Sequence, residues 1–278
     1  ILLGRGSAVW IEDPAYPGIS AVLRARDVHT VAVPVDQSGM DVEKAIELRP
    51  DARAAFVTPS HQYPIGMPMS MGRRLSLLRW AEKADAWIVE DDYDSELRYS
   101  GHPFPSLQGL DPSRVVYLGT MSKVLFSSLR IGYAIVPEPL VSAFSGARAL
   151  IDRHSPSADQ HVLASFMKEG HLEAHIRRIR NAYSERRDAL ISAIGRHFPE
   201  WAVLQPSDQG MHLVVWLPKS MSDVKVASDA RSAGIVVRPV SPLYASGRGR
   251  PGLMLGFGGF PIATLESAAR SLGEVLKK

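Results

Sequence analysis

The sequence has no cysteine among its 278 residues, which excludes disulfide bonds, cysteine-ligated metal sites and thiol catalysis. It also has no apolar run near the roughly 20 residues that a membrane helix needs, so we expect no membrane association. Neither sign of charge dominates, since the net charge is only +3. A charge this small does not indicate nucleic-acid binding. The lack of cysteine fits a reducing compartment, and we expect a cytoplasmic protein.

What is present is an ordinary globular composition, with 45% hydrophobic and 22% charged residues. A chain of this length has enough material for one large and one small domain. The opening residues, Ile1 to Gly6, contain no initiator methionine and no signal-peptide pattern, and an apolar run follows almost at once. We therefore expect the sequence to begin partway through a domain.

Short apolar runs alternate with amphipathic stretches in the first half, and several are continuously apolar, as is typical of strands buried on both faces of a mostly parallel sheet. Between them, Ser70–Lys83 predicts a helix capped by its first residue. Met71, Leu75 and Leu78 form its apolar face. The alternation predicts a doubly wound α/β domain, which we assign to residues 1–170. Its predicted strands are Ala8–Ile11, Val31–Val35, Ala54–Thr58, Trp87–Glu90, Val115–Leu118 and Gly132–Val136.

The second half of the sequence has a different pattern. A long amphipathic stretch at residues 172–197 predicts a connecting helix with one apolar face and one solvated, basic face. Short predicted strands then surround a helix at Asp223–Ser232, and a last helix is predicted at Ala263–Leu276. This pattern indicates a small α+β domain, which we assign to residues 171–278. Its predicted strands are His212–Leu217, Ile235–Arg238 and Leu253–Phe257.

Unusual polar segments follow three of the predicted strands. Ala54–Thr58 leads into a segment that ends at Gly66, and Trp87–Glu90 leads into a run of acids. Val115–Leu118 leads into a turn that contains Lys123. Ligands of open α/β sheets bind beyond the carboxyl ends of the strands. If these strands are neighbours, their ends form one site.

The acids at the second strand end are Glu90, Asp91, Asp92 and Asp94. Acids this close repel one another unless a cation or a protonated base lies among them. An acidic turn that caps the next helix explains them equally well. A metal site is disfavoured, because no histidine stands at ligand spacing and Tyr93 interrupts the run.

Lys123 follows two hydroxyl residues, Thr120 and Ser122, and precedes Arg130. Hydroxyls and a guanidinium suit a phosphate group. A lysine in a partly apolar site has a lowered pKa and attacks carbonyl carbons as a free amine. A lone lysine is usually a solvated surface residue. Here the neighbouring Thr120, Ser122 and Arg130 favour a lysine that reacts with a carbonyl group.

These segments together resemble fold-type-I aminotransferases, and more narrowly the aminotransferase-like effector domain of MocR-type regulators in the GntR group. The segments that carry the resemblance are Glu12–Gly18, Thr58–Gly66, Glu90–Glu96 and Gly119–Tyr133. The resemblance implies the aspartate aminotransferase-like fold of pyridoxal phosphate (PLP) dependent transferases, with a mostly parallel large domain and a small α+β domain. It also implies PLP as cofactor, a homodimer, and DNA contact only through a domain absent from this sequence.

The resemblance further implies a role for individual residues. Lys123 would form the Schiff base with the cofactor, and Asp91 would pair with the pyridine nitrogen. Tyr93 would bond to the phenolic oxygen of the ring. The residues that would hold the phosphate or stack on the ring are Thr120, Ser122, Arg130 and Tyr16.

Three departures from the family pattern bear on function. The family's glycine-rich phosphate loop, which precedes the Glu12–Gly18 motif, is missing here. Tyr63 stands where ordinary aminotransferases carry an asparagine that contacts the cofactor, and an aromatic residue there is typical of the regulators. Met254 stands where the family usually has the arginine that binds a substrate carboxylate. The arginines that would substitute for it, unless they are merely solvated loop charges, are Arg238, Arg248 and Arg250.

Three functions follow as hypotheses. The first is a sensor domain that binds an amine, an amino acid or a vitamer through PLP and signals to a DNA-binding domain. The second is an aminotransferase in which Lys123 moves the proton of a complete catalytic cycle. The third, an interaction module without cofactor, requires every cofactor residue to be a coincidence.

Overall fold

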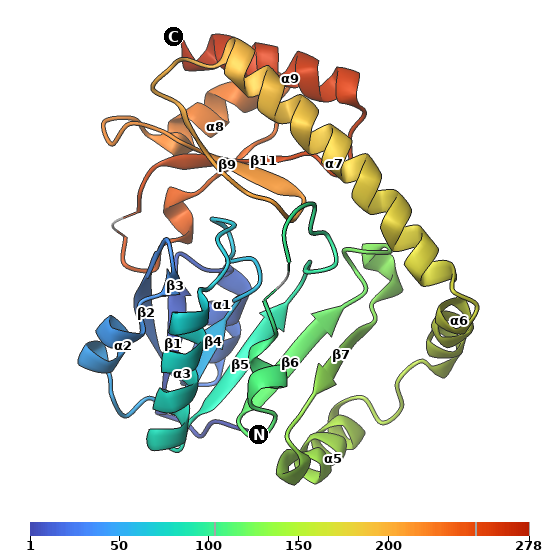
Figure 1. Ribbon diagram of the computed structural model, residues 1–278. Helices are drawn as coiled ribbons and strands as arrows, with labels where there is room; N and C mark the ends of the chain where they lie inside the picture. The colour runs from blue at the N-terminus through green and yellow to red at the C-terminus, as the bar shows by residue number, and fades with distance from the viewer. Residues whose placement is uncertain (103, 248, 278) are drawn as a thin grey trace.

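The computed structural model describes residues 1–102, 104–247 and 249–277, which build two β-sheets with helices packed on them (Figure 1). The strands of the larger sheet are β1 (Ala8–Asp13), β2 (His29–Asp36), β3 (Gly39–Met40), β4 (Ala54–Val57), β5 (Trp87–Asp92), β6 (Val115–Thr120) and β7 (Gly132–Ile135). Its helices are α1 (Pro17–Ala25), α2 (Val42–Leu48), α3 (Met71–Lys83), α4 (Leu107–Leu110), α5 (Val141–Ile151) and α6 (Ser157–Lys168). The remaining elements are α7 (His171–His197), β8 (Val203–Gln205), β9 (His212–Trp216), α8 (Asp223–Ser232), β10 (Arg238–Pro239), β11 (Gly252–Gly256) and α9 (Ile262–Leu276).

The larger sheet has the strand order β3-β2-β1-β4-β5-β6-β7. Strands β2, β1, β4, β5 and β6 run parallel, whereas β3 and β7 are antiparallel at the two edges. All six strands predicted for this half of the sequence are present, and the α/β class is confirmed. The parallel strands all end at the same edge of the sheet, where a ligand site is expected.

Continuous apolar runs form the central strands because helices cover both faces of the sheet (Figure 1). In β1, Val9 and Ile11 pack with Leu23 of α1 on one face. On the opposite face, Trp10 stacks on Trp80 of α3, with ring centroids 3.7 Å apart. The larger sheet therefore has a core on each side, as a doubly wound domain requires.

Helix α3 confirms the predicted cap but corrects the predicted face. The Ser70 hydroxyl accepts a hydrogen bond from the backbone N–H of Arg73 at 3.4 Å. Leu75, however, is 42% exposed, and the buried face is formed by Arg74, Leu77, Leu78, Trp80 and Ala81. Apolar periodicity fails here because Arg74 is buried, where its guanidinium donates to three backbone carbonyls.

The smaller sheet is antiparallel, in the order β10-β11-β9-β8, and packs against α8, α9 and the C-terminal part of α7. The apolar face predicted for α7 is confirmed, since Leu172, Leu190 and Ile194 are buried. The strand predicted at Ile235–Arg238 is wrong in its extent. Only Arg238 and Pro239 pair with β11. The apolar run before them reflects burial of the Val237 side chain and not strand pairing.

Helices α5 and α6 lie beside β7, at the margin of the molecule, and were not predicted (Figure 1). In α5 no residue is buried, and Leu150 and Ile151 are 87% and 81% exposed. Val162 of α6 is 69% exposed. In the part of the chain that the structure describes, no helix is both long and apolar enough to cross a membrane.

Candidate functional site

The candidate site lies where the strand order of the larger sheet changes direction. Strand β1 connects to β2 on one side, and the chain then returns to β4 on the other side. Such a switch point opens a crevice beyond the carboxyl ends of the strands. A small cavity of about 30 Å³ lies there, lined among others by Glu12, Tyr16, Thr58 and Asp91. The three polar strand ends that the sequence singles out are thus side by side on β4, β5 and β6.

Lys123 and Asp91 form the charged centre of the site. Asp91 lies near the end of β5, and Lys123 lies in the turn after β6, the neighbouring strand. Both are half-buried, and neither side chain has a hydrogen-bond partner among the described residues. Burial and the neighbouring acids raise the pKa of Asp91 to about 6, and the Lys123 ammonium opposes part of this rise. Asp91 is therefore poised to share a proton with a basic group near neutral pH.

The other acids of this segment are each occupied by the protein itself. The Glu90 carboxylate accepts from the backbone N–H groups of Leu107 and Gln108, so it caps α4. Asp92 accepts from the Tyr117 hydroxyl at 2.8 Å, and Asp94 pairs with His61 at 2.9 Å. The capping interpretation therefore holds for Glu90, while Asp91 alone remains available to a ligand. Within residues 1–102, 104–247 and 249–277, no group of three or more acids and histidines is arranged to hold a metal ion.

Tyr93, Tyr63 and Tyr16 form an aromatic cluster beside the two charged residues. The Tyr63 ring meets Tyr16 and Tyr93 edge-on, with centroids 5.9 and 6.2 Å apart. Burial raises the pKa of Tyr93 well above its ordinary value, so its hydroxyl stays protonated. Tyr16 precedes α1 and is 54% exposed, which leaves its ring accessible. All three tyrosines predicted to contact the cofactor thus lie together.

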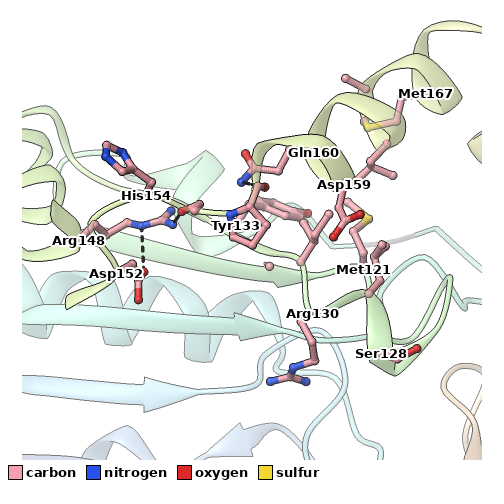
Figure 2. Close-up of a pocket in the computed structure, with 17 residues that line it drawn as sticks. Met121, Ser128, Arg130, Tyr133, Arg148, Asp152, His154, Asp159, Gln160 and Met167 are labelled. Atoms are coloured by element: carbon pink, nitrogen blue, oxygen red, sulfur yellow. Dashed lines mark hydrogen bonds and ion pairs between the residues drawn. The ribbon is translucent and has the colours of Figure 1, made fainter.

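Of the predicted phosphate residues, Thr120 ends β6, and Ser122 and Arg130 lie in the connection from β6 to β7. The Thr120 hydroxyl accepts from the backbone N–H of Ser122 at 3.1 Å, which fixes the turn before Lys123. Arg130 is exposed and adopts a left-handed conformation with φ of 52°. Arg130 and Arg148 both line a larger cavity of about 970 Å³. Figure 2 shows the Arg130 side chain pointing away from Arg148. Thr120 pairs with Gly132 in the β6–β7 ladder, so the backbone of Arg130, two residues before Gly132, lies close to the end of β6 that carries Thr120.

The arginines predicted to bind a substrate carboxylate have different surroundings. Arg238 of β10 stands directly opposite Met254 of β11, so both side chains leave the same face of the smaller sheet. Met254 is buried and packs in an apolar cluster that includes Tyr63. The Arg250 guanidinium lies 4.5 Å from the centroid of the Trp216 ring. Arg248 lies outside the described residues.

Two buried residues of the site were missed by the sequence predictions. Glu12, the last residue but one of β1, accepts from the Thr58 hydroxyl at 2.6 Å, while its Oε1 has no partner among the described residues. Burial raises its pKa to about 7. His61 is 1% exposed and bonds to Asp94 and Tyr93. An acid that directly follows the apolar strand at residues 8–11 was a usable signal for Glu12, whereas no local pattern pointed to His61.

The sequence model of the aminotransferase class I and II family matches residues 1–254. The chain belongs to this family. The probable rhizopine catabolism regulatory protein MocR of Rhizobium meliloti is 38% identical over 273 residues, covering 98% of this chain and 55% of that protein. The HTH-type pyridoxine biosynthesis transcriptional regulator PdxR of Corynebacterium glutamicum is 35% identical, covering 92% of this chain and 55% of that protein. The chain therefore spans about half the length of the curated relatives it matches.

Solved aminotransferases share the fold of this family member. The kynurenine aminotransferase of Pyrococcus horikoshii superposes with a TM-score of 0.92 at 29% identity, over 99% of this chain and 70% of that chain. LysN, the alpha-aminoadipate aminotransferase of Thermus thermophilus, superposes with a TM-score of 0.91 at 28% identity, over 99% and 72%. The predicted aspartate aminotransferase-like fold of PLP-dependent transferases is thereby confirmed.

Membership in this family implies pyridoxal 5′-phosphate as the cofactor. The donor set at the strand ends fits that molecule. The Lys123 amine and the Asp91 carboxyl, which have no hydrogen-bond partner in the part of the chain that the structure describes, interact electrostatically with each other. A protonated phenol, Tyr93, stands beside them, and the hydroxyls of Thr120 and Ser122 flank the turn. These groups match the aldehyde, pyridine nitrogen, phenolic oxygen and phosphate of the cofactor.

Proposed function

We propose that the chain is the PLP-binding, effector-sensing domain of a MocR/GntR-type transcriptional regulator, with residues 1–170 as its large and 171–278 as its small domain. Five relatives named as regulators are 34–38% identical to it. Three relatives named as aminotransferases are 27–29% identical. Four of the five are named as HTH-type transcriptional regulators, and the part of each that this chain does not match has room for a DNA-binding domain.

The observation that carries the sensor function is Met254. At this position the family resemblance leads us to expect a carboxylate-binding arginine, but the structure has a buried thioether packed against the cluster of Tyr63. A thioether makes no charge-assisted bond to a carboxylate. Weak binding of a substrate carboxylate favours a domain that recognises an effector and exchanges it at the cofactor over an enzyme that completes a catalytic cycle.

Each residue of the site then has a task toward the cofactor. When bound, PLP supplies an aldehyde that condenses with amines and an electron-withdrawing pyridine ring. Lys123 provides the amine that anchors it, and Asp91 holds the proton on the pyridine nitrogen. Tyr93 donates its hydroxyl proton to the phenolic oxygen, beside Tyr63. The phosphate and the exposed ring face are assigned to Thr120, Ser122, Arg130 and Tyr16.

The effector class follows from the same groups. A primary amine, an amino acid or the vitamer itself reacts with or occupies the site that Lys123 anchors. Arg238, on the same sheet face as Met254, is the side chain we assign to an effector carboxylate, with Arg250 as the second candidate. A complete aminotransferase is the alternative function, favoured by the presence of Lys123 and Asp91 together.

We also propose that the protein is a homodimer. Exposed apolar side chains concentrate on α5 and α6, where Leu150, Ile151 and Val162 are 87%, 81% and 69% exposed. A cavity of about 970 Å³ separates these helices from β7 and the loop that follows Lys123 (Figure 2). Large exposed apolar patches mark interfaces. A second copy on this face would cover the helices and close the cavity beside the cofactor site.

The function is tested by absorbance of the full-length protein mixed with PLP. We expect a visible absorption band in the wild type, no such band in Lys123→Ala, and an unchanged band in the control Lys83→Ala. Lys83 ends α3 and is exposed, away from the site. A panel of amino acids and amines is then added, followed by a keto acid.

The outcomes separate the two functions. A band that an effector shifts without turnover supports the sensor. Conversion to the amine form of the cofactor, with recovery on adding the keto acid, establishes the aminotransferase. A wild type without a Lys123-dependent band contradicts both.

A further inference from the structure

His61 is a buried histidine clamped between the two sheets. It follows β4, in the larger sheet, and is 1% exposed. Two glycines with positive φ, Gly66 and Gly210, approach its ring with bare backbone. A Cβ added at Gly66 would lie 3.0 Å from the His61 Nε2, and one added at Gly210 would overlap the ring. The ring is therefore closely packed by backbone from two segments.

The nitrogen that faces the larger sheet has two partners. His61 Nδ1 lies 2.9 Å from Asp94 Oδ2 and 3.1 Å from the Tyr93 hydroxyl oxygen. A carboxylate only accepts hydrogen bonds, so this nitrogen carries a proton and donates it. Because the same proton is shared with Tyr93, the tyrosine oxygen acts as an acceptor here. The hydrogen of the Tyr93 hydroxyl is then left free to point into the site.

The smaller sheet holds the other side of the ring. His61 Nε2 lies 3.5 Å from the Ser207 hydroxyl oxygen, which is a packing contact because the Ser207 hydrogen is donated to the Gln209 carbonyl at 3.0 Å. The backbone N–H of Gly210 bonds to the Leu97 carbonyl at 2.9 Å, next to the segment that carries Asp94. The direction of the imidazole is thus set by the segment after β5, through Asp94 and Tyr93, and by the connection between β8 and β9, through Gly210.

We propose that His61 is a positioning residue, which Asp94 orients so that the Tyr93 hydroxyl donates its proton to the phenolic oxygen of the cofactor. This inference rests on the proposed function for its ligand, and it adds a residue that family resemblance did not assign. Without His61, Tyr93 would be free to donate to Asp94, and its hydroxyl would no longer favour the cofactor.

The first test uses the full-length protein loaded with PLP and follows the absorption band against pH. Loss of the hydrogen bond to the phenolic oxygen destabilises its ionised form, so Tyr93→Phe should move the midpoint up by about one pH unit. His61→Phe keeps the ring shape but removes the donor, and it should move the midpoint in the same direction. His61→Asn places an amide N–H near the Nδ1 position, and it should restore the wild-type midpoint. The double variant with Tyr93→Phe should shift no further than Tyr93→Phe alone.

Two results would overturn the proposal in this test. One is a His61→Phe midpoint that equals the wild-type value while that of Tyr93→Phe moves. The other is a pair of shifts that add in the double variant, because independent residues would then be acting.

The second test needs no cofactor, so it also decides the case in which the proposed function fails or a variant does not fold. Nitrogen NMR of the histidine-labelled wild type reports which ring nitrogen carries a proton. We expect a protonated Nδ1 for His61, with the signal assigned through His61→Asn. An unprotonated Nδ1 would mean that the Tyr93 hydroxyl donates its hydrogen bond to His61, and the proposal would be wrong. A protonated Nδ1 in a protein that shows no Lys123-dependent band would uphold the geometry and reject only the cofactor.

Discussion

The site keeps one acid in an unfavourable state, and this state has a measurable cost. Burial raises the pKa of Asp91 from 3.8 to about 6, and the neighbouring carboxylates of Asp92 and Asp94, which are both hydrogen-bonded within the protein, add to this rise. A residue that is strained without its ligand is typical of a binding site. Glu12, with a pKa raised to about 7 and one unpaired oxygen, has the same character. The structure thus places its least satisfied acids around the cavity at the switch point.

Replacing Asp91 should therefore stabilise the cofactor-free protein while weakening the cofactor site. Its folded pKa lies above its unfolded pKa, so the contribution of this group to stability is lost as pH rises from about 4 to about 6. At pH 8 we expect Asp91→Asn to raise the free energy of unfolding by about 1–2 kcal/mol, and at pH 4 to leave it unchanged. Urea denaturation at the two pH values measures this, with PLP titration on the same variant. If the difference in free energy of unfolding between Asp91→Asn and the wild type is the same at both pH values, Asp91 ionises without strain and the prediction is wrong.

At the scale of elements, α3 tests which helix face carries the packing. Leu77 is fully buried under the larger sheet, whereas Leu75, two residues away, is 42% exposed. We expect Leu77→Ala to lower the free energy of unfolding by about 2–5 kcal/mol, because it leaves a cavity. Leu75→Ala should change it by less than about 0.5 kcal/mol, as exposed substitutions do. Denaturant titration of the two variants decides between the observed face and the one that periodicity indicates.

The same helix shows what sequence patterns reach and where they stop. Continuous apolar runs located the central strands β1, β4, β5 and β6, because most of their residues are buried between the helices on the two faces of the sheet. Apolar runs also located β2 and β7, although β7 is exposed along its length. The lysine turn and the acid–tyrosine segment placed the candidate site, since both follow strands at one sheet edge. Periodicity failed at Arg74, whose burial depends on carbonyls from distant segments. It also failed for α5, which has no buried residue to create a pattern, and for His61, whose contacts come from the segment after β5 and the connection between β8 and β9.

At the scale of the whole molecule, the exposed apolar side chains of α5 and α6 support the proposed homodimer. Leu150 and Ile151 are the last residues of α5, and their side chains are 87% and 81% exposed to solvent. If a second copy covers them, Leu150→Asp with Ile151→Asp should abolish self-association, because two buried charges without partners disfavour the interface strongly. Val236→Asp is the matched control, since Val236 is 75% exposed on the far, smaller sheet side and should leave association unchanged. Sedimentation of the full-length protein, measured with and without PLP, gives the result. A wild type that sediments as a monomer would refute the homodimer, and a dimer that survives the double substitution would place its interface elsewhere.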